Sequence, residues 1–175
     1  KKVNNYRPNK KFIIVEPQNH KNFESRNLSF NKIQEFVNII KEKYNDKLEV
    51  IQISPSKFAD KESKFLDNCI VYNDIFTYRE TILFGKYAEL ALVPHGGLSI
   101  GFAAVDTKVL AIYPCIHRVA MTTYDTEIPF EVSDGNHYTC FLENCEKCKN
   151  LRDIFDREHF HKVIEAAENI LDPLI

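Results

Sequence analysis

The residues best suited to binding chemistry form the turn His95-Gly96-Gly97-Leu98-Ser99, which follows a short apolar run. Glycine permits a tight turn and lets backbone N–H groups approach a ligand closely. A helix beginning here presents unpaired N–H groups and the positive end of its dipole. The sequence therefore predicts an anion site, most naturally for a phosphate or diphosphate group. The alternative is a strand-to-helix turn that requires a positive φ angle and binds nothing.

Within this turn, the N–H groups of Gly97, Leu98 and Ser99 are the candidate phosphate ligands, with the Ser99 hydroxyl group in support. His95 is a candidate partner of a phosphate or ribose group. Because histidine titrates near neutral pH, it is also a candidate proton carrier. The alternative for His95 is a structural role in capping the turn. The pattern matches neither the Gly-x-Gly-x-x-Gly fingerprint nor a P-loop.

A second group of chemistry-bearing residues consists of His137, Cys140, Cys145 and Cys148. These are the ligand types of a structural zinc site, and Cys145-x-x-Cys148 has the spacing of a zinc knuckle. Such an ion would pin an otherwise irregular segment. The alternative is a run of free thiols in a loop. The chain has five cysteines, and an odd number does not fit a disulfide framework, so we expect a reducing, cytoplasmic setting.

The elements that must position these residues belong to one domain of ordinary size. The chain has 175 residues, a formal charge of −2 and 44% hydrophobic residues, which is enough for a core. The near-neutral charge argues against a domain that holds nucleic acid. No apolar run approaches the roughly 20 residues of a membrane span. The chain begins at Lys1 without an initiating Met, so we expect it to be part of a longer protein.

Strand and helix patterns alternate along most of the chain. This alternation predicts an α/β fold with a doubly wound, mainly parallel, Rossmann-like sheet, whose ligands bind beyond the carboxyl ends of the strands. We expect a linker over 1–10 and the domain over 11–175, with an irregular segment over 115–150. The predicted strands are 12–15, 48–53, 69–72, 90–93 and 108–113, and the predicted helices begin near 29, 77, 97 and 160.

Pro17 follows the first strand, Tyr78-Arg79-Glu80-Thr81 opens a helix, and Phe102-Ala103-Ala104 follows the glycine turn. In this order, these features resemble the C-terminal half of glycosyltransferase family 9, the heptosyltransferase-like enzymes of bacterial surface-polysaccharide assembly. The segment Thr123-Tyr124-Asp125 and the cysteine-rich stretch also look like features of one branch of the family. The resemblance implies one half of a GT-B glycosyltransferase, the half that binds the nucleotide-sugar donor.

Several further site residues are implied by the resemblance. Arg26 matches the basic residue of the donor loop, and its planar guanidinium group suits a diphosphate. Glu62 lies where the family has a carboxylate that contacts the donor, and Tyr124 is a candidate contact of the sugar or base. Solvent exposure of Arg26 and Glu62 and simple packing of Tyr124 are the alternatives. The chain departs from the family pattern at His95, where an acidic residue is usual, and at Ile100, where a histidine is common.

The resemblance also implies how the chemistry is divided between two domains. Metal-independent, inverting transfer requires a general base, and the family takes this base from its N-terminal half, so we expect the present chain alone to transfer nothing. The expected partners are the nucleotide-sugar donor, a saccharide acceptor and the N-terminal domain of the same chain. The expected location is the cytoplasm, at the inner face of the membrane. The alternatives are a non-catalytic GT-B-like module and a nucleotide-sugar epimerase of GT-B fold.

Overall fold

The computed structural model describes residues 2–17, 29–54, 65–113, 124–131 and 146–175. Within these residues, six parallel strands form one sheet in the order β3-β2-β1-β4-β5-β6. The predicted α/β fold with a doubly wound, Rossmann-like sheet is therefore confirmed. The strands are β1 Lys11–Val15, β2 Leu48–Ser54, β3 Ile70–Asn73, β4 Leu90–Pro94, β5 Val109–Tyr113 and β6 Glu127–Glu131.

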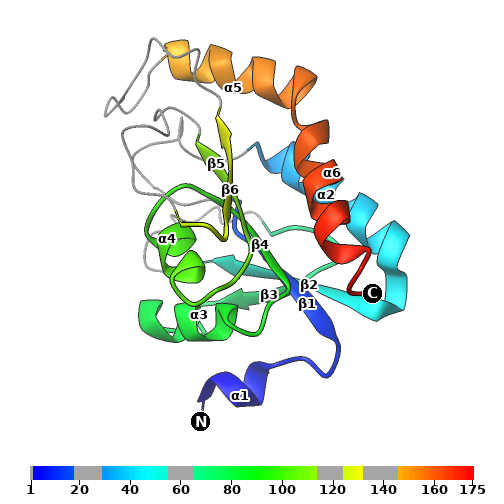
Figure 1. Ribbon diagram of the computed structural model, residues 1–175, viewed down its shortest axis with the longest axis vertical. Helices are drawn as coiled ribbons and strands as arrows, with labels where there is room; N and C mark the ends of the chain where they lie inside the picture. Colours follow the sequence, from blue (N-terminus) through cyan, green and yellow to red (C-terminus); the bar gives the residue numbers. More distant parts are fainter. Residues whose placement is uncertain (1, 18–28, 55–64, 114–123, 132–145) are drawn as a thin grey trace.

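Helices cover both faces of the sheet (Figure 1). One face packs against α2 and α6 through a core cluster that includes Ile13, Val37 and Val163. The opposite face packs against α3 and α4 through a second cluster that includes Ile14, Phe84 and Phe102. The described helices are α1 Lys2–Tyr6, α2 Phe30–Tyr44, α3 Tyr78–Gly85, α4 Gly97–Ala103, α5 Glu146–Glu158 and α6 His161–Leu171, with a 3-10 turn, η2, at Asn45–Lys47.

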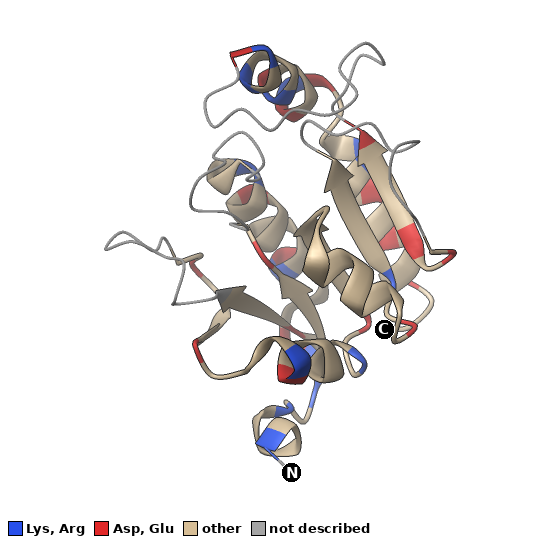
Figure 2. Cartoon of the chain, turned by 90° about the vertical axis from the view of Figure 1, so that its left-hand side faces the viewer, with Lys and Arg blue, Asp and Glu red and all other residues tan. Residues whose placement is uncertain are grey.

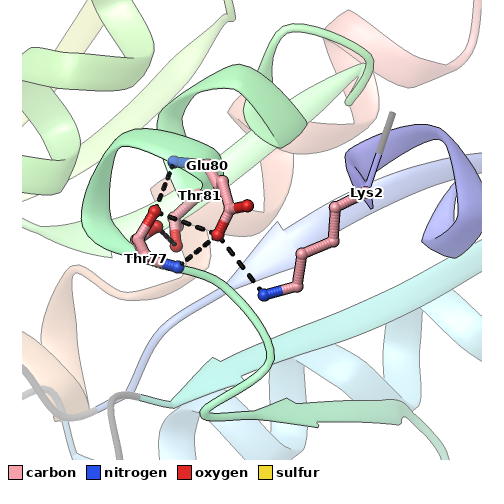
Figure 3. A network of polar contacts seen from close by, with 4 residues as sticks. All are labelled: Lys2, Thr77, Glu80 and Thr81. Carbon is pink, nitrogen blue, oxygen red and sulfur yellow. Dashed lines mark hydrogen bonds and ion pairs between the residues drawn. The ribbon is translucent and has the colours of Figure 1, made fainter.

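The predicted start of α3 is confirmed by a capping box. The Thr77 side chain accepts a hydrogen bond from the Glu80 backbone N–H, and the Glu80 carboxylate accepts one from the Thr77 N–H at 2.8 Å (Figure 3). Lys2 on α1 lies 3.4 Å from the same carboxylate. The capping box therefore fixes the first turn of α3 and also connects it to the start of the chain.

Two stretches contain more regular structure than the sequence patterns indicate. The stretch 1–10, expected as a linker, includes the short helix α1, whose last residue, Tyr6, packs edge-on against Tyr72 and Phe76. The stretch 115–150, expected as irregular, includes β6 and the start of α5. An edge strand tolerates Pro129 because one side of its backbone needs no partner strand.

On the side of the molecule that Figure 2 shows, charged residues of both signs are mixed among the described residues. Lysines and arginines alternate with aspartates and glutamates along the outer helices, whereas α4, with the sequence GLSIGFA, carries no charge (Figure 2). The helices that the structure describes include none with the length and apolar character of a membrane span. The uncharged α4 is the helix that follows the glycine turn.

Candidate functional site

The site lies where the strand order reverses, between β1 and β4. Strands β1 and β4 are neighbours in the sheet but not in the chain, with Val15 opposite Leu92. Crevices beyond the carboxyl ends of strands at such a switch point are the usual ligand sites of doubly wound sheets. Glu16 directly follows β1, and His95 directly follows β4. The fold thus brings an acidic residue and the predicted glycine turn to the same edge.

The glycine turn is built without a left-handed backbone at its first glycine. Gly96 has φ 168° and ψ −161°, an extended conformation, so the alternative that explained the turn by a positive φ does not apply there. Gly97 is exposed, and its carbonyl oxygen accepts a hydrogen bond of 2.6 Å from Tyr78 Oη. A Cβ atom at Gly97 would lie only 2.9 Å from Tyr78 Oη, so the close approach of the Tyr78 side chain requires glycine at this position.

The start of α4 leaves backbone donors available, but the Ser99 hydroxyl group is already engaged. The first hydrogen bond within α4 runs from Ile100 N to Gly96 O, so the N–H groups of Gly97, Leu98 and Ser99 have no acceptor within the helix. The buried Ser99 Oγ accepts from Gly96 N at 3.0 Å and lies 3.0 Å from Gly96 O. Ser99 therefore stabilises the turn through its side chain.

His95 belongs to a buried polar network. Its ring stacks on Tyr113 with a centroid distance of 4.1 Å, and its Nδ1 atom lies 3.3 Å from Glu127 Oε1. Tyr113 donates a hydrogen bond of 2.9 Å to the same carboxylate oxygen. Only 1% of the His95 side chain and none of the Glu127 side chain is exposed. His95 Nε2 and Glu127 Oε2 have no hydrogen-bond partner among the described residues. The network can hold the imidazole ring and leave Nε2 for a ligand.

Glu16, at the carboxyl end of β1, has a buried carboxyl group. It is 1% exposed, and its Oε2 atom has no hydrogen-bond partner within the described part of the chain. Burial raises the pKa of Glu16 from 4.5 to about 8, because the charged form loses its water without gaining a counter-charge. At neutral pH the carboxyl group therefore keeps its proton and can act as a hydrogen-bond donor.

The remaining predicted site residues lie elsewhere or outside the described residues. Tyr124 precedes β6, is 41% exposed, and its carbonyl oxygen accepts a hydrogen bond from Glu127 N. Cys148 is buried on α5. No group of three or more candidate metal ligands occurs in the described ranges. The other candidates, Arg26, Glu62, His137, Cys140 and Cys145, lie outside the described residues.

A separate open cavity of about 660 Å³ lies between the start of α2 and α5. Its lining includes Ser29, Lys32, Asp153, Asp156 and Arg157. Ser29 forms a hydrogen bond with the side chain of the half-buried Asp156, so one of the polar groups at the start of α2 already has a partner in α5. None of the predicted site residues that the structure describes lines this cavity.

Structural comparisons place this architecture among known proteins. The chain is similar to half of the Escherichia coli ADP-heptose LPS heptosyltransferase II (TM-score 0.69, 13% identity, 97% of this chain and 50% of that chain). The chain has the fold of one half of a GT-B glycosyltransferase. The chain is also similar to the iron-containing dodecameric glycosyltransferase TibC of enterotoxigenic E. coli H10407 (TM-score 0.70, 9% identity, 97% of this chain and 47% of that chain). A further match is a family 9 glycosyl transferase of Veillonella parvula DSM 2008 (TM-score 0.62, 12% identity, 96% of this chain and 48% of that chain).

The matches cover only part of each similar protein, at low sequence identity. The chain spans about half the length of each of these glycosyltransferases. No protein-family model matches the sequence, and no curated protein matches it significantly. The comparisons therefore establish the fold, and the role of the chain has to be argued from its own residues.

Three residues of the site lack a local sequence signal. Tyr113 and Glu127 contact His95 from the end of β5 and the start of β6, which lie 18 and 32 positions further along the chain. Glu16 is a single acidic residue after an apolar strand. An acidic residue directly after the first strand is only a weak sequence signal of a ligand site. Its place at the switch point becomes apparent only when the strand order is known.

Proposed function

We propose that the chain is the nucleotide-sugar-binding half of a glycosyltransferase. The observation that carries the proposal is the similarity of 97% of the chain to half of an ADP-heptose heptosyltransferase. The site supports it, since the exposed Gly97 backbone and the N–H groups of Leu98 and Ser99 lie at the carboxyl end of β4. Doubly wound sheets bind ligands at this edge.

The proposed role of these groups is to stabilise the leaving nucleoside diphosphate. Glycosyl transfer breaks the bond between the sugar and the diphosphate, so negative charge develops on the phosphate oxygen. Fixed N–H groups aimed at that oxygen lower the barrier because they need no reorganisation during the reaction. Arg26, Glu62 and Tyr124 are the further proposed donor contacts, and His95 is a proposed partner of a phosphate or ribose group through Nε2.

The proposal assigns the other half of the reaction to a separate domain. We propose an N-terminal acceptor-binding domain of the same protein, which supplies the general base, and a saccharide acceptor. The chain alone would then bind a donor and transfer nothing. The E. coli neighbour is an ADP-heptose LPS heptosyltransferase, which supports a role in bacterial surface-polysaccharide synthesis, and a TibC structure contains ADP-D-β-D-heptose, which supports a nucleotide-sugar donor. We propose that the protein acts in the cytoplasm, at the inner face of the membrane.

A non-catalytic GT-B-like module is the alternative. His95 and Ile100 favour it, because they stand where the family usually has an acidic residue and often has a histidine. This alternative predicts donor binding without transfer even when both halves are present. An epimerase of GT-B fold would need acid–base residues in this half, and Glu16 is the described residue that suits such a role.

We also propose a structural metal ion held by His137, Cys140, Cys145 and Cys148, with no metal required for the transfer itself. The buried position of Cys148 suits a structural ligand better than a reactive thiol. Zinc is the expected ion, and iron is the competitor because TibC is described as iron-containing. We expect about one equivalent of zinc in the purified protein by plasma mass spectrometry, and less in Cys148→Ala. A wild-type protein without zinc or iron would contradict the metal site.

Calorimetry against ADP-, UDP- and GDP-linked sugars tests the donor-binding proposal. We expect one of these nucleotide sugars to bind, and we expect Gly97→Ala to weaken that binding at least tenfold. The added methyl group displaces Tyr78 Oη and disturbs the exposed backbone of the turn. Leu83→Ala, on the exposed side of α3, is the matched control. A folded wild-type chain that binds none of the three would contradict the proposal.

A further inference from the structure

Glu16 occupies a position that packing alone does not explain. Its backbone N–H donates a hydrogen bond of 3.0 Å to Leu92 O, so Glu16 continues β1 alongside β4 into the switch point. Its side chain is buried, and Oε2 has no hydrogen-bond partner among the described residues. A buried polar atom without a partner costs free energy, which a bound ligand atom would recover. The carboxyl group therefore suits a ligand contact.

The surroundings of Glu16 connect it to the glycine turn. Burial and, to a smaller extent, the negative charge of an ionised Glu16 raise the pKa of Tyr78, in the first turn of α3. The Tyr78 hydroxyl group donates a hydrogen bond of 2.6 Å to the Gly97 carbonyl oxygen. Helix α4 carries no titratable side chain, and His95, at the end of β4, already faces Glu127 through Nδ1. Within the described residues, burial alone accounts for the raised pKa of Glu16, about 8, so the group is neutral at pH 7.

We propose that Glu16 is a further donor-binding residue, and that its neutral carboxyl group donates a hydrogen bond to a phosphate oxygen of the nucleotide sugar. This inference rests on the proposed donor-binding function. A neutral O–H group pairs well with a charged oxygen, because hydrogen bonds to ionised acceptors are about twice as strong as neutral ones. An ionised Glu16 would instead repel the diphosphate. Donor affinity should therefore depend on the proton that Glu16 holds.

The test is the pH dependence of nucleotide-sugar binding by the whole chain. The probe is whichever of ADP-glucose, UDP-glucose and GDP-mannose binds, because the phosphates of these compounds keep their charge between about pH 6 and 9. We expect the dissociation constant of the wild type to be about tenfold larger at pH 9 than at pH 7. Glu16→Gln keeps an N–H donor and should bind with little change over this range. Glu16→Leu removes the donor and should bind at least tenfold more weakly at pH 7.

The outcomes separate this inference from the proposed function. Wild-type affinity that stays constant to pH 9, or a Glu16→Gln variant that keeps the wild-type pH dependence, overturns the role of Glu16 and leaves the proposed function standing. Wild-type protein that binds none of the probes at any pH overturns the proposed function and this inference with it. Near-ultraviolet circular dichroism checks the fold of each variant. If Glu16→Leu does not fold, the pH profile of Glu16→Gln decides.

Discussion

Glu16 couples folding to proton binding, because burial raises the pKa of its carboxyl group from 4.5 to about 8. Between these two values the folded chain holds one proton more than the unfolded chain, so the free energy of unfolding decreases as pH rises. This contribution to stability is complete below about pH 4.5 and is lost as the pH passes through about 8. One group contributes a slope of at most about 1.4 kcal/mol per pH unit.

We therefore predict that Glu16→Gln flattens the pH dependence of stability. The glutamine side chain fits the same space and has no proton to lose, so the variant should gain stability over the wild type between about pH 5 and pH 8. Urea unfolding at these two pH values measures the effect. Glu158→Gln, the same change at an exposed position on α5, should leave the wild-type slope intact. Parallel slopes for wild type and Glu16→Gln would contradict the prediction.

At the same scale, the sequence indicates which residues form the turn but not which residues support it. His95 and the two glycines are adjacent in the chain, so their pattern is visible locally. Tyr113 and Glu127 reach His95 only because β5 and β6 pair beside β4 in the sheet. Their contacts depend on strand order and register, which no local spacing specifies. The metal site and the contacts of Arg26 and Glu62 remain predictions.

Among the elements, the ones with an apolar run, an apolar stripe or a clear helix-start signal could be predicted, and the ones without such a signal could not. Strands β1, β4 and β5 are mostly short apolar runs, β2 and β3 contain β-branched residues beside polar ones, and α2 and α6 each show a continuous apolar stripe. β6 has the sequence EIPFE, in which a proline and two acidic residues interrupt the apolar pattern that would indicate a strand. Helix α5 is strongly charged and buries only Cys148 and Phe155, so its apolar stripe is too narrow to stand out.

The contact between α3 and α4 depends on glycine at the end of α3. These two helices lie on the same face of the sheet (Figure 1). A Cβ atom at Gly85 would collide with the Phe102 ring of α4. We predict that Gly85→Ala destabilises the fold by about 1–3 kcal/mol, the usual cost of inserting an atom group into a close-packed core. Chemical denaturation measures this loss.

A second variant separates the collision from other effects of the substitution. Phe102→Leu shortens the side chain that Gly85 approaches, so the double variant should lose less stability than the sum of the two single variants. Losses that simply add, or a Gly85→Ala variant as stable as the wild type, would contradict the close contact between α3 and α4. Since α4 follows the glycine turn, the same contact also fixes the position of the turn.

For the whole molecule, the modest charge of −2 is compatible with binding a diphosphate. The described charges are mixed over the surface, and the site at the end of β4 lies beside an uncharged helix (Figure 2). Backbone N–H groups and a neutral carboxyl group can bind an anion without a basic face. Under the proposed function, this chain supplies the donor contacts and another domain supplies the acceptor contacts.

The amide spectrum of the ¹⁵N-labelled chain, recorded during titration with a bound nucleotide sugar, tests the central claim most directly. We predict that the largest shifts occur at Gly96, Gly97, Leu98 and Ser99 and at Glu16, and that the matching nucleoside without phosphates shifts the glycine turn much less. Shifts confined to the residues around the cavity between α2 and α5, with the turn unchanged, would contradict the account.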